Sequence, residues 1–569
     1  MIARAAGWLL QGYARHRRRA LEDIWRHAAA TQEATLLRLV ATARDTVYGQ
    51  AHEFHRIRSV ADYQHQVPVR EYLDFRPLWQ RALAGAHDLT WPGRPRHWVN
   101  TSGTTAGEKL IPVTAKALAS HRKGGWDAFL LAAERAGPAH LLGGPMLFLG
   151  GTSALRPVGR GCLVGDLSGL VVRRLPPGIR QRYSPGPTVA AIPDWEMRLS
   201  AVAAMAARQD LRLLSGMPSW VLILLERVAS AQRAAGGPIP DLGGCWPNLK
   251  VFIHGGVAFP PYRRNFEERI GRPLDCIEVY PASEGFVAVQ TETTGGLTLM
   301  LDYGIFYEFL PIEDVGRDQP RRHTVADVEL GRSYAIVLTT PSGLWSYLLG
   351  DTVRFTARDP LRLEITGRTR HFVNAFGENV IVEEIERALV EACRRTGAEV
   401  VEFTVAPRYP TPAESRGGHD WLVEFRVPPR DREEFTQSLD ETLKGLNPDY
   451  RIKRSGEVGM TRPRVIQVPQ GTFYRWMREA GRLGDQHKVA RVTNSRSIAD
   501  AVLAAVPANT REHPPTADTS CNAMPASFRC PGPPMRASFA DLPRPDAQDH
   551  GGGRSINSTA NGIDSDVLG

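Results

Sequence analysis

The segment Thr101-Ser102-Gly103-Thr104-Thr105-Ala106-Gly107-Glu108-Lys109 is the most informative stretch of this 569-residue chain. Glycines allow a backbone to turn tightly, so that successive N–H groups converge on an anion. The serine and threonine hydroxyls add hydrogen-bond donors, and Lys109 adds a mobile cation. The segment therefore predicts a loop that binds nucleotide phosphate, with an ordinary polar surface turn as the alternative.

The spacing of this segment differs from that of a Walker-type P-loop, which needs four residues between its glycines and then Gly-Lys-Ser/Thr. Here three residues separate Gly103 from Gly107, and Glu108 precedes the lysine. Leu110 occupies the position where a magnesium-binding hydroxyl should be. The spacing thus rejects a Walker-type site.

Length and composition are typical of a soluble enzyme with about two to four domains. Hydrophobic residues make up 42% of the sequence and charged residues 23%, as in ordinary globular proteins. No apolar run approaches the roughly 18 residues of a membrane span. The apolar residues 5–10 precede the arginine-rich residues 15–19, which is the reverse of a secretory signal. We expect a cytoplasmic, monomeric protein without a membrane span.

The net charge of +9 is spread along the chain, because residues 15–19 form the one dense arginine cluster. We interpret this cluster as the solvated face of a first helix and expect no nucleic-acid partner. Six cysteines without a CxxC pair argue against a disulfide framework or a zinc site. Only seven of the 70 basic residues are lysines. Lys109 and Lys488 are therefore candidates for roles that need a compact ammonium.

Short apolar runs alternate with helical patterns in the first half of the chain. Residues 20–90 and 115–136 have helical patterns. Residues 146–149, 249–253 and 277–279 are predicted strands, each leading into a turn with glycine or proline. This alternation predicts an α/β fold whose strand ends carry the ligand.

The pattern changes after residue 298, where closely spaced short runs up to residue 358 predict a small antiparallel sheet or barrel. The pattern of short apolar runs is interrupted at Gly367-Arg368. Beyond this break the pattern predicts an α+β unit made of a helix that ends near Gly397, strands over 400–405 and 421–427, and a helix over 431–445.

The last stretch, from about residue 506, is rich in proline and polar residues. It contains too little apolar surface to offset the entropy of ordering, so we predict disorder. The predicted organisation is a large domain over residues 1–366, a small domain over residues 367–503 and a disordered tail over residues 504–569.

Two further motifs follow predicted strands. Tyr280-Pro281-Ala282-Ser283-Glu284-Gly285 brings together an aromatic ring that can stack on a base, a hydroxyl and a carboxylate that can hold magnesium. Tyr347-Leu348-Leu349-Gly350-Asp351 ends another predicted strand, where an aspartate can accept both hydroxyls of a ribose. Alone, each motif is also compatible with an ordinary turn.

The three motifs, in this order, resemble the nucleotide motifs of the adenylate-forming superfamily that includes firefly luciferase and acyl-CoA synthetases. Residues 20–495 more narrowly resemble the Gretchen Hagen family of acyl acid amido synthetases, the auxin-responsive family of plants with bacterial relatives, and in particular its bacterial-type members. The segments that carry this resemblance are Asp45-Thr46-Val47-Tyr48-Gly49, Val67-Pro68-Val69, Lys109-Leu110-Ile111-Pro112-Val113-Thr114, Gly216-Met217-Pro218-Ser219-Trp220, Phe306-Tyr307-Glu308-Phe309 and Gly484-Asp485-Gln486-His487-Lys488.

The resemblance implies a large N-terminal adenylate-forming domain, with α/β sheets and a small β-barrel, and a smaller mobile C-terminal α+β domain. It implies an ATP-dependent, AMP-forming ligase that uses magnesium. Such enzymes convert a carboxylic acid into an acyl adenylate and pyrophosphate, and then transfer the acyl group to the amine of an amino acid. Because one anion attacks another, this chemistry needs positive charge and metal more than covalent work by the protein.

The resemblance also carries individual roles onto this sequence, with Ser102, Glu284 and Lys488 as the catalytic residues. Lys488 corresponds to the swinging lysine that stabilises charge at the α-phosphate, and a solvated loop lysine is the alternative. The implied roles in ATP binding are phosphate for Ser102, Gly103, Thr104 and Thr105, pyrophosphate for Lys109, adenine for Gly255, Gly256 and Tyr280, α-phosphate for Ser283, magnesium for Glu284, ribose for Asp351, and ribose or phosphate for Arg368.

Two positions depart from the family pattern. Thr101 stands where a serine is usual and keeps the hydroxyl, whereas Leu348 stands where plant members tend to have an arginine. We assign no role to that lost charge. The acyl pocket is expected to hold a small apolar or aromatic acid. Its candidate residues, for each of which core packing is the alternative, are Met217, Trp220, Trp126 and Phe129.

Three other functions remain open from the sequence. An acyl-CoA ligase shares the adenylation step, although the Asp485-Gln486-His487-Lys488 segment fits the amide-forming family better. A non-catalytic nucleotide-binding protein is a second alternative. It would not need the competent residues found at the magnesium, ribose and phosphate positions. A basic nucleic-acid-binding scaffold is the third, and no recognisable module supports it.

Overall fold

The computed structural model describes residues 2–101, 109–234, 241–257, 259–369, 372–373, 378, 380–409, 417–454, 460–483, 488–493 and 495–506, all of which belong to one compact unit. The predicted phosphate-binding residues Ser102 to Thr105 lie outside the described residues, as does the predicted tail from residue 507 onward. The predicted domain boundaries therefore stay predictions.

Five helices form the N-terminal part, as the pattern over residues 20–90 indicated. They are α1 (Ile2–Arg26), α2 (Ala28–Ala43), α3 (Val47–Ala51), α4 (Val60–Gln66) and α5 (Tyr72–Leu83). Side-chain caps fix two of their starts, because the Thr46 hydroxyl accepts from the Gly49 N–H and the Ser59 hydroxyl accepts from the Asp62 N–H.

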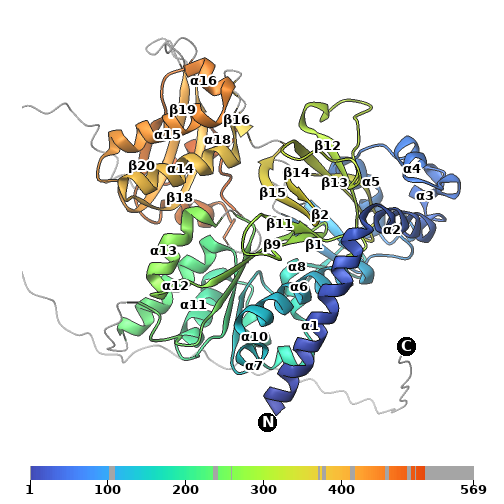
Figure 1. Cartoon of the computed structure of the whole chain (residues 1–569), viewed down its shortest axis with the longest axis horizontal. Helices are drawn as coiled ribbons and strands as arrows, with labels where there is room; N and C mark the ends of the chain where they lie inside the picture. Colours follow the sequence, from blue (N-terminus) through green and yellow to red (C-terminus); the bar gives the residue numbers. More distant parts are fainter. Residues whose placement is uncertain are drawn as a thin grey trace, which may run out of the picture. The chain divides into compact units, whose positions relative to one another are not determined.

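An 11-stranded sheet forms the centre of the molecule, with the order β12-β13-β14-β15-β11-β10-β9-β8-β7-β3-β6 (Figure 1). Its parallel part contains β3 (Met146–Leu149), β6 (Tyr183–Ser184), β7 (Leu213–Gly216), β8 (Val251–Gly255) and β9 (Asp275–Pro281). The strands predicted over 146–149, 249–253 and 277–279 are thereby confirmed.

Helices cover both faces of the parallel part. They include α6 (Ala115–Ala136), α11 (Trp195–Ala206), α12 (Pro218–Ala234) and α13 (Pro260–Ile270). Successive strand residues alternate between the two faces: Leu214 and Phe252 lie in the core of α11 to α13, whereas Leu213, Val251 and Ile253 lie in the core of α1 and α6. This explains why the strands are continuously apolar and confirms the predicted α/β architecture.

The antiparallel part of the sheet contains β10 (Phe286–Val289), β11 (Leu297–Leu299), β12 (Phe306–Pro311), β13 (Ser333–Thr340), β14 (Leu344–Arg358) and β15 (Leu361–Arg368). These strands continue the main sheet, because β10 pairs with β9 and β11 pairs with β15. They also curl: the Tyr307 hydroxyl on β12 donates to the Val287 carbonyl on β10, a strand several positions away. The predicted small barrel is this curled half.

The third motif differs in one respect from its prediction. Residues 347–351 lie within the long strand β14 and do not end it. The backbone deviates locally instead, since Ser346 and Gly350 have φ values of 42° and 90°. Gly350 tolerates such a conformation readily because it has no Cβ.

A separate four-stranded sheet contains the two end residues of the first motif, Thr101 and Lys109. It has the order β2-β1-β5-β4, with β1 (His97–Thr101), β2 (Lys109–Val113), β4 (Arg156–Val158) and β5 (Cys162–Gly165). Strands β1 and β2 are antiparallel, and Thr101 and Lys109 are register partners. The glycine-rich segment therefore connects two adjacent strands.

The C-terminal part is an α+β unit around the sheet β18-β19-β20, as predicted (Figure 1). Its elements are β16 (Phe372–Val373), β17 (Val380–Ile381), α14 (Val382–Thr396), β18 (Glu399–Arg408), β19 (Gly418–Val427), α15 (Arg432–Leu446), α16 (Pro448–Arg454), β20 (Arg464–Val468), α17 (Thr472–Glu479) and α18 (Ser497–Ala504). Helix α14 ends at Gly397, which has a φ of 71°, as the sequence predicted.

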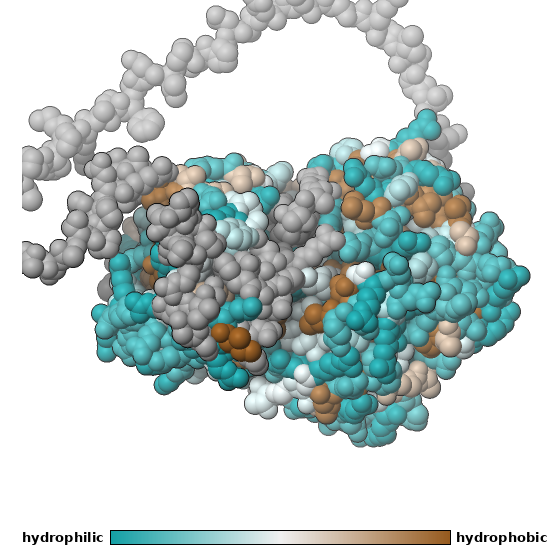
Figure 2. All heavy atoms as spheres, turned by 90° about the horizontal axis from the view of Figure 1, so that it is seen from above, coloured by the Kyte–Doolittle hydropathy of each residue, from teal (hydrophilic) through white to brown (hydrophobic). Residues whose placement is uncertain are grey.

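Short helices complete the described chain. They are η1 (Phe54–Arg56), α7 (Pro138–Leu141), α8 (Leu167–Val172), α9 (Pro177–Arg180), α10 (Gly186–Ala190) and η2 (Ile312–Asp314). Among the helices of the described residues, none has the length and apolar composition to cross a bilayer. The face in Figure 2 is largely hydrophilic, and its apolar residues form small separate patches.

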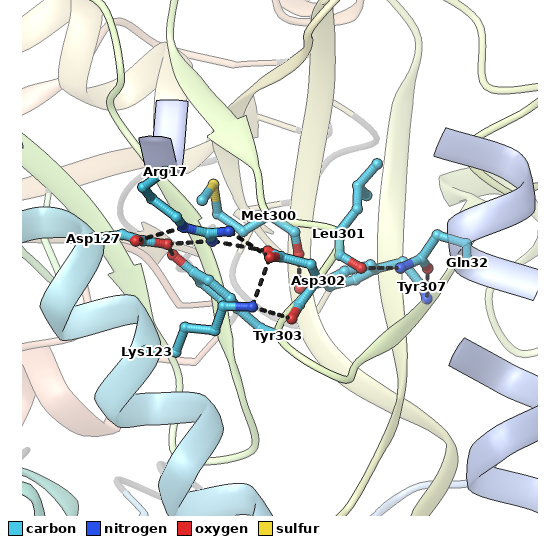
Figure 3. Close-up of polar contacts among 9 residues, drawn as sticks. All are labelled: Arg17, Gln32, Lys123, Asp127, Met300, Leu301, Asp302, Tyr303 and Tyr307. Atoms are coloured by element: carbon cyan, nitrogen blue, oxygen red, sulfur yellow. Dashed lines mark hydrogen bonds and ion pairs between the residues drawn. The ribbon is translucent and has the colours of Figure 1, made fainter. Parts of the chain in front are cut away.

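One arginine of the basic cluster on the first helix belongs to an unexpected, partly buried ion network (Figure 3). The Arg17 guanidinium donates to the Asp127 carboxylate of α6 at 2.6 and 2.9 Å and to Asp302 at 2.7 Å. Lys123 also donates to Asp302, at 2.6 Å, and the Tyr303 hydroxyl donates to Asp127, at 2.8 Å. The interpretation of this cluster as a solvated face is therefore wrong for Arg17. A surface-like run of arginines does not reveal which member meets a carboxylate.

We expect Arg17→Ala to lower the free energy of unfolding by about 3 kcal/mol, because it leaves the buried Asp127 carboxylate without its cation. The Arg17 and Asp127 side chains are 12% and 4% exposed. Arg18→Ala is the matched control, since Arg18 and Glu134 form an exposed pair, and we expect it to cost less than about 1 kcal/mol. Urea denaturation measures both, and equal losses would contradict the importance of the buried network.

Candidate functional site

Asp351 lies where three elements of the curled sheet meet. Its carboxylate accepts a hydrogen bond from the Tyr280 hydroxyl of β9 at 2.6 Å and another from Arg368 Nε of β15 at 2.8 Å. Asp351 and Arg368 are also register partners on β14 and β15. The second motif, the third motif and the Gly367-Arg368 break are thus joined through one carboxylate.

Glu284 is the second carboxylate of this site, and it is 9% exposed. The Tyr347 hydroxyl of β14 donates to it at 3.4 Å. Burial raises the pKa of Glu284 above its ordinary value, and the charge of Asp351 raises it further, while Arg368 and Lys109 lower it. The two carboxylates are therefore neighbours whose negative charge is incompletely compensated, which favours the binding of a cation.

Lys109, the last residue of the first motif, contributes positive charge to the same place. It begins β2, and its Nζ lies 5.5 Å from the centre of the Tyr72 ring. Its charge acts on the pKa of Glu284, so the two motifs lie close together.

Lys488 comes from the far end of the described chain and approaches the end of β8. Its Nζ donates to the Gly256 carbonyl at 2.5 Å. The residue as a whole is exposed, but desolvation of its ammonium and the nearby charge of Arg368 lower its pKa to about 8, against the opposing effect of Asp351. Lys488 therefore belongs to the same charge cluster as Asp351 and Arg368.

The two glycines at the end of β8, Gly255 within the strand and Gly256 just after it, are each required by close contacts. A Cβ at Gly255 would lie 2.3 Å from the Val279 carbonyl oxygen, so β8 and β9 tolerate no side chain there. Gly256 has a φ of 90°, and a Cβ on it would lie 3.1 Å from Lys488 Nζ and 3.7 Å from Met217 Sδ. Gly256 thus provides room for the lysine.

Ser283 is buried, and a residue that the sequence reasoning missed lies against it. His121 of α6 is 4% exposed, and its ring hydrogen-bonds with the backbone of Ser283. Burial lowers the pKa of His121 to about 4, so its ring is neutral at physiological pH. Its Nδ1 has no hydrogen-bond partner among the described residues. A histidine on the apolar side of a predicted helix was the available signal.

Most of the candidate acyl-pocket residues pack in cores. Trp220 packs edge-on against Trp195, with the ring centroids 4.6 Å apart. Trp126 and Phe129 of α6 belong to the core beneath α1, and Trp126 also lies against Tyr13. Met217 lies beside Gly256, since a Cβ added to that glycine would be 3.7 Å from Met217 Sδ.

The metal prediction depends on Glu284. The described residues contain no group of three or more histidine, cysteine or carboxylate side chains placed to hold a metal. A magnesium ion there would therefore take much of its coordination from phosphate oxygens and water, as it commonly does. The buried, undercompensated carboxylate of Glu284 fits that mode of binding.

Comparison with protein families identifies the class of protein to which this fold and site belong. Residues 17–206, 298–368 and 383–497 match the N-terminal, central and C-terminal domains of the GH3 family. Together these matches cover well over half of the chain. The chain belongs to the GH3 family, the Gretchen Hagen family that its motifs resemble.

Relatives in this family have named activities. Indole-3-acetic acid-amido synthetase GH3.3 of Arabidopsis thaliana is 25% identical over 271 residues, which cover 44% of this chain and 45% of that protein. The chain therefore spans about half the length of that relative in the alignment. Probable indole-3-acetic acid-amido synthetase GH3.1 of the same plant is 22% identical over 554 residues, covering 85% of this chain and 92% of the relative.

The fold is similar to that of a solved GH3.15 acyl acid amido synthetase. The TM-score is 0.71 at 18% sequence identity, over 86% of this chain and 96% of the other. The likeness confirms the predicted fold class, a large N-terminal α/β part followed by a smaller C-terminal part.

We expect Gly256→Ala to displace the Lys488 ammonium, because the new Cβ would crowd Nζ. Acetylation of Lys488 by acetic anhydride as a function of pH, followed by mass spectrometry, measures its pKa. This value should rise from about 8 toward the ordinary 10.5. Gly304→Ala is the control, since Gly304 also has a positive φ, 74°, but a Cβ added there would meet no atom beyond its chain neighbours within 4 Å. An unchanged Lys488 titration in Gly256→Ala would speak against the contact.

Proposed function

We propose that this chain is an AMP-forming ligase, which adenylates a small carboxylic acid with ATP and transfers the acyl group to the amine of an amino acid. The observation that carries the proposal is the convergence of Lys109, Glu284, Asp351 and Lys488, which come from four separate segments of the chain. Membership of the GH3 family and the amido synthetase activities of its named relatives support the same assignment.

In the first step, a carboxylate oxygen of the acid attacks the α-phosphorus of ATP. The new O–P bond forms as the bond to the β-phosphate oxygen breaks, and pyrophosphate leaves. Both reactants are anions, so catalysis depends on positive charge that is already in place. Lys488 supplies charge at the α-phosphate and Lys109 supplies it at the departing pyrophosphate.

The remaining residues hold the nucleotide. Asp351 accepts from Tyr280 and Arg368, but a carboxylate has about four acceptor positions, so two ribose hydroxyls still find acceptors. The Tyr280 ring stacks on adenine, and Ser283 contacts the α-phosphate. The backbone at Gly255 and Gly256 lies along the adenine, and Ser102, Gly103, Thr104 and Thr105 bind phosphate.

Magnesium fits at Glu284, where it would neutralise phosphate charge during the displacement. In the second step, the amine of the amino acid attacks the activated carbonyl carbon, the C–O bond to AMP breaks, and the amine loses a proton. Transfer to coenzyme A in place of an amine is the runner-up. The assignments to the cytoplasm, to a monomer and to a bacterial-type member stay predictions from the sequence.

Acid-dependent exchange between ATP and labelled pyrophosphate tests the adenylation step. A panel of carboxylic acids that includes indole-3-acetic acid should give exchange with at least one member. AMP release with a panel of amino acids, and separately with coenzyme A, then identifies the acceptor. Nucleotide binding without any acid-dependent exchange would instead indicate a non-catalytic protein.

We expect the exchange rate to fall as the pH rises through about 8, because the Lys488 ammonium, whose pKa is lowered to about 8, then loses its charge. The rate falls with rising pH because the protonated ammonium is the form that stabilises charge at the α-phosphate. Lys488→Ala should lower exchange by about tenfold or more, equivalent to about 1.4 kcal/mol. Lys488→Arg keeps its charge at these pH values, so a decline of the same shape in this variant would assign the titration to another group.

We expect Glu284→Gln to lower exchange by about 100-fold, or about 2.7 kcal/mol, because a neutral amide binds magnesium poorly. The rate should also need a higher magnesium concentration for half-saturation. Glu278→Gln is the matched control, since Glu278 is a half-buried carboxylate on β9 whose pKa desolvation raises to about 7. Similar magnesium dependences for wild type and Glu284→Gln would remove Glu284 from the metal site.

A further inference from the structure

We propose that Arg491 is a positioning residue for Lys488, fastening the Lys488 segment to helix α13 through Tyr262. This inference rests on the proposed function for its catalytic meaning. The structural contact that it describes is independent of the substrates.

The segment after Lys488 is fixed to the sheet of the C-terminal unit by its backbone. The Val405 N–H of β18 donates to the Arg491 carbonyl at 2.8 Å, and the Thr493 N–H donates to the Val405 carbonyl at 3.1 Å. The Thr404 hydroxyl donates to the Ala490 carbonyl at 2.7 Å. In chain order, Ala490 is the first residue held by these contacts. Lys488 precedes Ala490 by two residues and therefore extends from an anchored edge.

The Arg491 side chain reaches from this edge to α13. Its side chain is 7% exposed. One Nη donates to the Glu402 carboxylate of β18, and the other donates to the Tyr262 hydroxyl of α13. The guanidinium also lies 4.7 Å from the Phe403 ring centre and 5.6 Å from the Tyr262 ring centre, which suits cation–π attraction.

Tyr262 belongs to the part of the chain that Lys488 contacts. It is 1% exposed and packs in the same core as Phe252 and Phe259, beside β8. Gly256, which accepts from Lys488, precedes Tyr262 by six residues. Two polar contacts, Lys488 with Gly256 and Arg491 with Tyr262, thus join the same two short segments.

The residue types explain why an arginine is needed at this position. A planar guanidinium donates in two directions at once, so one side chain satisfies a carboxylate and a hydroxyl on different elements. Its burial makes each partner important, since a desolvated charge that loses a partner is costly. Glu386 of α14 lies 3.9 Å from Arg491 Nε and adds a second carboxylate.

The consequence concerns where the Lys488 ammonium lies. While Arg491 holds Tyr262, the backbone between residues 488 and 491 has little freedom, and Nζ stays at the Gly256 carbonyl beside Arg368 and Asp351. When that contact breaks, the segment stays bound to β18 but its position relative to α13 is no longer fixed. The ammonium then returns to solvent.

Tyr262→Phe tests this in the full chain, because it deletes only the hydroxyl that accepts from Arg491. Arg491→Lys is the second variant, since lysine cannot reproduce the planar fork. Tyr450→Phe is the matched control: Tyr450 is equally buried, and its hydroxyl donates to Asp440 at 2.8 Å within the C-terminal unit. Thermal unfolding verifies that each variant is folded.

Acetic anhydride labelling against pH gives the first readout, which needs no substrate. The Lys488 pKa should move from about 8 toward 10.5 in Tyr262→Phe and Arg491→Lys, and should stay near 8 in Tyr450→Phe. An unchanged Lys488 titration in both test variants overturns the inference. An equal change in Tyr450→Phe also overturns it, because it would indicate a general effect of packing.

Pyrophosphate exchange gives the second readout, with the acid that supports exchange in the wild type. Tyr262→Phe should lower the rate by about tenfold and shift the decline of the rate to higher pH, while Tyr450→Phe stays within about twofold of the wild type. A wild-type chain that exchanges with no acid would contradict the proposed function, and the labelling readout would still decide the role of Arg491.

Discussion

The hydrogen bonds of Asp351 are the interaction on which the site depends. Tyr280 and Asp351 lie on β9 and β14, which are separated in the sheet by β10, β11 and β15. A 2.6 Å hydrogen bond between them requires the sheet to curl until its non-adjacent strands meet. Arg368 then neutralises the carboxylate from the neighbouring strand β15. The curl of the antiparallel half of the sheet therefore also brings the nucleotide motifs together.

Much of the fold could be predicted because local patterns decide it. Helix α6 has the predicted bounds, residues 115–136, and α14 ends at Gly397 as predicted, since periodicity and a glycine cap are local signals. The long strand β14 could not be predicted in the same way. Its first half contains two residues with positive φ, Ser346 and Gly350, and a glycine at such a position makes the sequence resemble a strand end. Cross-strand pairing maintains the strand through this irregularity.

Within the site, the sequence identified the charged residues but not their partners. Glu284, Asp351, Arg368 and Lys488 belong to motifs whose residue types suggest chemistry, and the structure brings them together. The bond from the Tyr280 hydroxyl, the place of His121 against Ser283 and the burial of Arg17 depend on contacts between residues far apart in the sequence. Such contacts leave no periodicity to detect. Arg491 is a further example, because its partner Tyr262 lies 229 positions away.

The balance of charge explains why the site needs contributions from several parts of the chain. The neighbouring carboxylates of Glu284 and Asp351 repel each other, and the charge of Asp351 raises the pKa of Glu284, so the pair would be unfavourable if cations were not nearby. Lys109 and Arg368 supply two positive charges from β2 and β15. The ammonium of Lys488 is different, because desolvation and Arg368 both disfavour its charged form. Its presence there must be maintained by contacts outside the charge cluster, and a polyanion such as a triphosphate would convert this unfavourable position into a favourable one.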